Sequence, residues 1–188
     1  MATCVVLIAD AGPRLGNPPE ALQPHTSSMN LYELMETVRS FDGVLELAPD
    51  EGSGFPEIAW GDHFFYYAPD GQIPAGQPYA TVVTKDYPDE PSSGLDRPDR
   101  WRVNIHVGGA RSAELLGGEP GDLAATTDFT RSDVVHPHPV YHRQGWIAVV
   151  CPGPATSDTV VALLRDAHRA AERRASKRRV ESAGEGEG

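Results

Sequence analysis

The residues best suited to chemistry lie in and near a strand-like segment at 101–107. This segment alternates, so that Arg102, Asn104 and His106 share one face of a strand while apolar residues share the other. The chain has only two lysines against fourteen arginines, and one of them, Lys85, ends the preceding strand-like segment. A guanidinium, an amide, an imidazole and a nearby ammonium could together clamp an anion and move a proton.

Asp62 and Tyr67, from an earlier predicted hairpin, could join this polar face. In an enzyme, His106 or His138 would act as general acid or base while Lys85 stabilises negative charge. The alternative is a face that only meets water, because one face of an antiparallel sheet commonly does so.

A second constellation is the pair His136 and His138, each followed by proline. Residues before proline favour an extended backbone, which would place both imidazoles on one side. With His106 and a carboxylate such as Asp62, they would supply a ligand set suited to zinc or iron. The alternative is that these rings only form hydrogen bonds within a loop. The full set of predicted ligand-binding residues is Asp62, Tyr67, Lys85, Arg102, Asn104, His106, His136, His138 and Tyr141.

Strands and helices must position these side chains. Strand-like segments separated by Pro- and Gly-bearing turns are predicted at 44–48, 57–60, 63–68, 79–85, 101–107 and 145–151. An amphipathic helix follows Asn30, which forms a capping box with Glu33, and Gly43 is expected to end it. A second amphipathic helix begins after Thr156 or Ser157, one of which is expected to cap it. We therefore predict an α+β fold, an antiparallel meander with the N- and C-terminal helices packed on one face.

The chain reads as one domain with irregular ends. Residues 1–28 mix Gly, Pro, Asn and Ser without periodicity, and 181–188 is a Gly/Glu tail, so both are predicted to be disordered or irregular. The single domain then spans 29–180. Within it, the polar stretch 86–100 is long enough to be either a functional or a mobile loop.

Composition limits the classes of function. The formal net charge of -11 disfavours nucleic acid, since binding to phosphates depends on Lys and Arg. Two widely separated cysteines, Cys4 and Cys151, and no apolar run long enough for a membrane span or signal peptide predict a cytoplasmic protein. The preference for Arg over Lys suggests a GC-rich bacterial genome. No phosphate-binding loop, dinucleotide fingerprint or catalytic Ser motif is present, so the cofactor stays unidentified.

Residues 161–180 hold seven Lys or Arg against two Asp or Glu, in an otherwise acidic chain. This basic stretch could dock an acidic partner protein, chiefly through Arg173, Arg174, Arg178 and Arg179.

Six motifs carry a family resemblance: FPEIAWGD at 55–62, FFYYAPDG at 64–71, YATVVTKDYP at 79–88, WRVNIHV at 101–107, HPHPVY at 136–141 and GWIAVV at 145–150. They resemble an actinobacterial family of uncharacterised proteins, which implies no particular activity, cofactor or catalytic residue. The order of elements is also distantly similar to MmcQ/YjbR-like proteins. That resemblance implies a CyaY-like fold, for which DNA binding through a double-wing surface has been proposed, but the acidic charge of this chain departs from that role.

The leading hypothesis is therefore a protein that binds a small polar or anionic molecule on the polar sheet face. The alternatives are an enzyme that uses His and Lys acid-base or metal-assisted chemistry, and a protein-interaction module.

Overall fold

The computed structural model describes residues 29–184. The leader predicted at 1–28, with Cys4, lies outside the described residues. The last helix continues to Gly184, so the tail predicted at 181–188 begins as helix, and its remaining four residues lie outside the description.

The first helix, α1 (Leu31–Arg39), begins as the sequence predicts. The Asn30 side chain accepts from the Glu33 backbone N–H at 2.9 Å, and the Glu33 carboxylate accepts from the Asn30 N–H at 3.0 Å. The prediction that Gly43 ends the helix is wrong, because Ser40 is its C-cap. Gly43 instead has φ +70° in the turn before the first strand, where an added Cβ would lie 2.9 Å from the Tyr67 ring.

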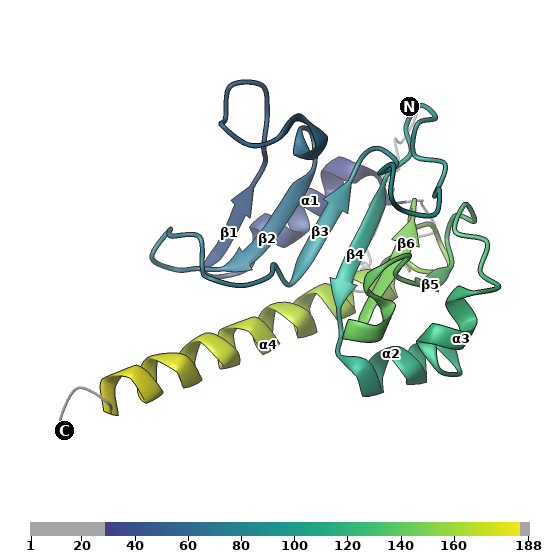
Figure 1. Cartoon of the computed structure of the whole chain (residues 1–188). Helices are drawn as coiled ribbons and strands as arrows, with labels where there is room; N and C mark the ends of the chain where they lie inside the picture. The colour runs from purple at the N-terminus through teal and green to yellow at the C-terminus, as the bar shows by residue number, and fades with distance from the viewer. Residues whose placement is uncertain (1–28, 185–188) are drawn as a thin grey trace, which may run out of the picture.

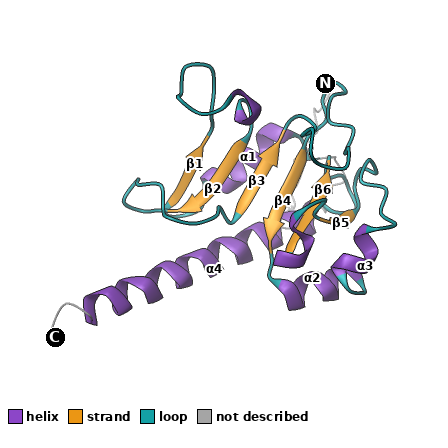
Figure 2. Cartoon of the chain, viewed as in Figure 1, coloured by secondary structure: helices purple, strands orange, loops and turns teal. Residues whose placement is uncertain are grey.

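Six strands form one antiparallel sheet in the order β1-β2-β3-β4-β6-β5 (Figure 1). The strands are β1 (Val44–Leu47), β2 (His63–Tyr67), β3 (Ala80–Val83), β4 (Arg102–His106), β5 (Val135–Pro137) and β6 (Trp146–Val150). The first four form the predicted meander. The chain then passes through α2 (Gly109–Leu116) and α3 (Pro120–Ala124), and β6 pairs with β4 while β5 takes the edge (Figure 2).

One segment predicted as a strand is not one. Residues 57–60 contain a short 3-10 helix, η1 (Glu57–Ala59), preceded by Pro56. The Trp60 indole N–H donates to the Phe55 carbonyl at 3.1 Å. This hydrogen bond lies within the segment and does not join it to a neighbouring strand. The sequence also gave no prediction of α3 or of the 3-10 helix η2 (Tyr141–Gln144).

The two faces of the sheet differ, as the alternation in β4 predicts. Val103 and Ile105 point to the face covered by α1 and α4 and are buried in the core. In Figure 1 α1 and the first part of α4 lie behind the sheet, which confirms the predicted packing on one face, and the rest of α4 extends past the ends of the strands. Arg102 and Asn104 point to the other, uncovered face. The core residues of the helix-covered face include Leu34, Val38, Phe65, Val82, Val103, Ile105, Ile147, Val149, Leu163 and Leu164.

The last helix, α4 (Ser157–Gly184), begins at the predicted position, directly after Thr156. The Thr156 hydroxyl donates to the Asp133 carboxylate, and the Ser157 hydroxyl donates to the Gly153 carbonyl. Asp133, from the loop before β5, also accepts from the backbone N–H groups of Ala155 and Thr156. A distant carboxylate thus holds the residues just before the helix and places a favourable charge near its N-terminus. Neither α4 nor any other described helix is long and apolar enough to cross a membrane.

Candidate functional site

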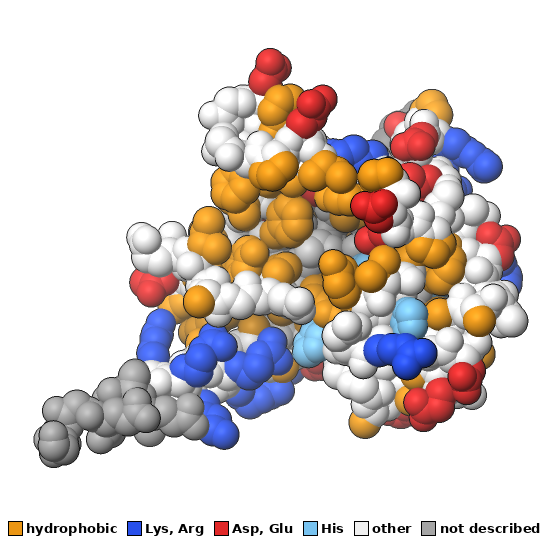
Figure 3. Space-filling view, in the orientation of Figure 1, with side chains coloured by type: hydrophobic (Ala, Val, Ile, Leu, Met, Phe, Trp, Pro, Cys, Tyr) orange, Lys and Arg blue, Asp and Glu red, His pale blue; other side chains and the backbone are white. Residues whose placement is uncertain are grey.

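The uncovered face of the sheet carries a cavity of about 350 Å³, which we call the sheet cavity. Hydrophobic side chains spread over this face, as Figure 3 shows. Aromatic rings and a few buried polar groups line the cavity, a composition typical of small-molecule sites. Its lining residues are Phe64, Tyr66, Gln77, Pro78, Thr81, Val83, Tyr87, Glu90, Arg102, Asn104, His138, Tyr141 and Trp146.

Arg102 lies at the sheet-cavity wall, and only 2% of it is exposed. Its Nη1 donates to the Ser93 hydroxyl and its Nη2 to a Glu90 carboxylate oxygen, both at 2.8 Å. The guanidinium is therefore buried and ion-paired rather than free to clamp an anion. Its Nε is buried without a hydrogen-bond partner among the described residues.

The loop predicted at 86–100 supplies both partners of Arg102. The Asp86 carboxylate accepts hydrogen bonds from the backbone N–H groups of Ser93, Gly94 and Leu95. Burial alone would raise the pKa of Asp86, but these bonds and one from a serine hydroxyl outweigh it and lower the pKa. A carboxylate that stays ionised thus holds the loop against the cavity.

Asn104 lies beside Arg102 on β4 and is 1% exposed. Its Nδ2 donates to the Thr81 hydroxyl at 2.9 Å, which fixes the amide. Its Oδ1 is buried and has no hydrogen-bond partner among the described residues. A buried acceptor without a partner costs about 1–3 kcal/mol, so this atom is suited to receive a hydrogen bond from a bound molecule.

His138 is a neutral ring with a fixed proton position. Its Nδ1 accepts from the backbone N–H groups of Val140 and Tyr141, each at 3.1 Å, so the ring proton is on Nε2. Burial, and then the charge of Arg102 and the nearby His142 ring, lower the pKa of His138 to about 3. Nε2 forms no hydrogen bond within the described part of the chain, so this N–H is a donor on a cavity-lining residue.

Asp62 does not line the sheet cavity. It is fully buried, and one carboxylate oxygen accepts from the Thr84 backbone N–H at 2.9 Å and from the Thr84 hydroxyl at 3.2 Å. The other accepts from the hydroxyl of Tyr87, which does line the cavity. Burial, and then this bond to Asp62, raise the pKa of Tyr87. Asp62 therefore positions a lining tyrosine rather than contacting a ligand itself.

Lys85 does not join the polar face. Its ammonium donates to the Trp60 backbone carbonyl and lines neither the cavity that holds His138 nor those that hold His106. The predicted grouping of Lys85 with the histidines is therefore not formed. Its place in the fold explains a lysine at this position, since it ties the η1 segment to the end of β3.

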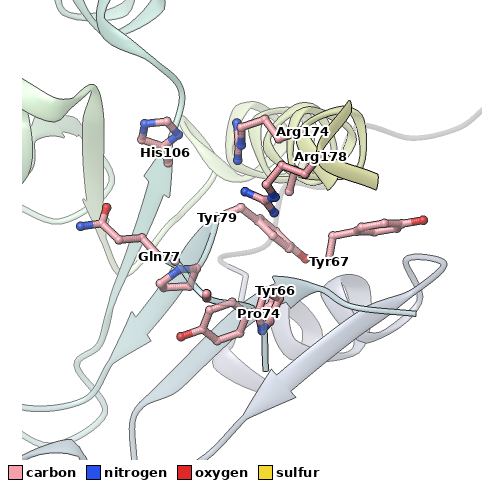
Figure 4. A pocket seen from close by; sticks show the side chains of 12 residues that line it. Tyr66, Tyr67, Pro74, Gln77, Tyr79, His106, Arg174 and Arg178 are labelled. Carbon is pink, nitrogen blue, oxygen red and sulfur yellow. The ribbon is translucent and has the colours of Figure 1, made fainter. Parts of the chain in front are cut away.

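Tyr67 and His106 line a second cavity of about 280 Å³, which we call the helix-edge cavity. It lies between α4 and the loop before β3 (Figure 4). The His106 Nε2 lies 3.1 Å from the Gln144 carbonyl. Burial, and then the positive charge of Arg174, lower the pKa of His106, while the bond to Gln144 opposes them.

His136 belongs to neither cavity. Its Nε2 lies 2.8 Å from the Arg131 carbonyl, and its ring packs against Phe129. Since His138 uses its Nδ1 within its own loop, the predicted metal-binding trio of His106, His136 and His138 is not brought together. No group of three or more His, Cys, Asp or Glu residues in the described part of the chain is placed to hold a metal ion.

Sequence reasoning missed several lining residues of the sheet cavity. Thr81 and Tyr66 share the open face by strand alternation, which the sequence contains, but only the strand register shows that Thr81 pairs with Asn104 of β4. Trp146 opens β6 and packs against His138, with ring centroids 6.1 Å apart. Tyr87 and Glu90 come from the loop after β3, and no sequence signal predicts where that loop folds.

Comparisons with known proteins give the family but no activity. No curated protein matches the chain. A crystal structure of a Deinococcus radiodurans protein with a DUF419 domain is similar to it, with 15% sequence identity, a TM-score of 0.44, and coverage of 74% of this chain and 76% of that one. Residues 29–180 match a family described as a family of unknown function, DUF6194. Because this match spans most of the chain, the protein belongs to the DUF6194 family.

Proposed function

We propose that the sheet cavity binds a small, flat molecule with an apolar body and at least one hydrogen-bond donor and one acceptor. The observation that carries this proposal is the pair of open polar groups on buried lining residues. Asn104 Oδ1 is an acceptor without a partner, and His138 Nε2–H is a donor without one, among the described residues. A molecule that bonded to both would remove the free-energy cost of leaving the buried Asn104 Oδ1 unpaired, and would gain a hydrogen bond from His138.

The rings around these groups favour a flat ligand. Tyr141 and Trp146 flank His138, at centroid distances of 5.0 and 6.1 Å, and Phe64 and Tyr66 line the cavity from β2. Aromatic surfaces prefer offset-stacked or edge-to-face partners, which gives a planar ligand an additional attraction. The volume of about 350 Å³ fits a small molecule rather than a macromolecular segment.

Binding is better supported than acid-base catalysis at this cavity. With a pKa of about 3, His138 is neutral near pH 7 and its Nδ1 already accepts two hydrogen bonds. It therefore cannot take up a proton there as a general base. The same neutral ring is a fixed donor that could hold a ligand carbonyl or ring nitrogen.

Heteroaromatic amide fragments and their hydrocarbon counterparts, screened by ligand-observed NMR with calorimetry on the hits, test the proposal. His138→Asn keeps an acceptor for the Val140 and Tyr141 N–H groups but removes the Nε2–H. We expect this change to weaken amide fragments about tenfold, the equivalent of one hydrogen bond, and to leave the hydrocarbons nearly unchanged. His142→Asn is the matched control, because His142 lies in the same turn but does not line the sheet cavity. Equal affinity of amides and hydrocarbons, or no loss in His138→Asn, would contradict the proposal.

A further inference from the structure

The helix-edge cavity has a cationic wall. Arg174 and Arg178 lie one turn apart on α4 and both line it, and none of its lining residues is acidic. Figure 4 shows the two side chains extending from the same side of the helix, toward His106 and Tyr79. Neither arginine has an ion-pair partner among the described residues. Burial, and then repulsion by Arg178 and Arg173, lower the pKa of Arg174.

A buried aromatic ring lines the same cavity. Tyr79 is 1% exposed, and its hydroxyl is buried without a hydrogen-bond partner within the described residues. The ring is held by the core, 5.2 Å from the His168 ring centroid. The two guanidinium groups that share the cavity with this fixed ring are donors suited to an oxyanion.

The two cavities are neighbours. Tyr66, Gln77 and Pro78 line both of them. A molecule that passes over these three residues would reach the helix-edge cavity from the sheet cavity. The sheet cavity offers a neutral donor and acceptor with aromatic rings, whereas the helix-edge cavity offers positive charge.

We propose that the helix-edge cavity binds the anionic group, a phosphate or a carboxylate, of the molecule whose flat body occupies the sheet cavity. This inference rests on the proposed function and adds the chemical class of the ligand, a heteroaromatic acid or phosphate ester. Arg174 and Arg178 hold the anion by charge-assisted hydrogen bonds. The two arginines are exposed at the cavity rim, so they can adjust to either anion.

Calorimetry on the full chain with three matched probes tests this inference: a heteroaromatic fragment as its neutral alcohol, its phosphate monoester and its carboxylate. We expect at least one anionic probe to bind about tenfold or more tightly than the alcohol, and the stronger of the two identifies the anion. This gain should vanish in Arg174→Gln/Arg178→Gln. The control Arg165→Gln/Arg169→Gln removes the same charge at the same spacing on α4, outside the helix-edge cavity, and should keep the gain.

The outcomes separate the two proposals. If all three probes bind equally well, the anionic subsite is wrong and the sheet-cavity proposal stands. If none of them binds, both are wrong. A gain that is the same in both double variants overturns the role of Arg174 and Arg178. An oligo-glutamate peptide provides a further comparison. If this peptide binds more tightly than the anionic probes and displaces them, the anionic subsite is wrong, and α4 instead binds an acidic partner protein.

Discussion

The arginines of the sheet cavity and of the helix-edge cavity differ in their exposure and in their ion pairing. In the sheet cavity Arg102 is 2% exposed and is paired with Glu90 and Ser93 from an anchored loop. In the helix-edge cavity Arg174 and Arg178 are exposed and have no ion-pair partner in the described structure. A buried, paired charge fixes the shape of a wall, whereas an exposed, unpaired charge remains able to bind an anion. The two cavities thus differ in what their arginines can do, although they share three lining residues.

Removing the partner of the buried arginine should have the largest effect. Glu90→Gln leaves the Arg102 charge buried without its counter-ion, which we expect to lower the free energy of unfolding by about 3 kcal/mol. Arg178→Gln, in the helix-edge cavity, should change it by about 0.5 kcal/mol or less, because the side chain is exposed. Urea unfolding of both variants measures the contrast.

Glu114→Gln is the control for the substitution itself, since Glu114 forms an exposed ion pair with Arg111. We expect it to behave like Arg178→Gln. A loss in Glu90→Gln no greater than in Glu114→Gln would contradict the description of the sheet cavity as a wall held by a buried ion pair.

The pH dependence of stability should show the next effect. The pKa of His138 is about 3 in the folded protein, below the value of about 6.5 for an unperturbed histidine. The unfolded state therefore binds a proton as the pH falls below about 6.5, while the folded state does not until about pH 3. This contribution to stability is complete above pH 6.5 and is lost toward pH 3, by about 1.4 kcal/mol per pH unit.

We therefore expect His138→Asn to remove part of the acid sensitivity. Between pH 7 and pH 5 the unmodified protein should lose about 2 kcal/mol more of its free energy of unfolding than the variant does. The other histidines are present in both proteins, so their contributions cancel in this difference. Parallel pH profiles of the two proteins would mean that His138 is not held neutral by burial.

The sequence predicted the fold well because the fold depends on local periodicity. The alternation of Val103 and Ile105 with Arg102 and Asn104 placed the two faces of β4 correctly. The predicted strand at 57–60 is wrong because a four-residue segment with three apolar side chains can form either a strand or a short 3-10 turn, and the pattern does not distinguish them.

The site was predicted only in part because it depends on contacts between distant segments. Asn104 and His138 are predicted site residues that line the sheet cavity, but whether their polar atoms are paired depends on Thr81 and on the turn after β5. The rarity of lysine drew attention to Lys85, whose ammonium bonds to a backbone carbonyl. Glu90 is a cavity residue only because Asp86 folds the loop back, and no local pattern encodes that path.

The smallest predicted effect concerns the electrostatic influence of the exposed arginines. Burial and Arg174 both lower the pKa of His106, so Arg174→Gln should raise it, but only in part because burial remains. The charged residues Arg111, Asp166, Arg169 and Arg173 line a hollow on another side of His106 and are unchanged in the variant. An NMR titration of the His106 ring measures this rise, with Arg165→Gln as a control on the same helix.

Salt distinguishes the two causes of the low pKa of His106. In about 1 M salt the Debye length falls to about 3 Å, so the influence of an exposed arginine is screened. The pKa of His106 in the unmodified protein should then rise toward that of Arg174→Gln, and the difference between the two proteins should shrink. His138, whose pKa is lowered mainly by burial, should respond much less to salt. If salt changed the pKa values of His106 and His138 equally, the arginines of the helix-edge cavity would be no more accessible to solvent ions than the buried Arg102–Glu90 pair of the sheet cavity.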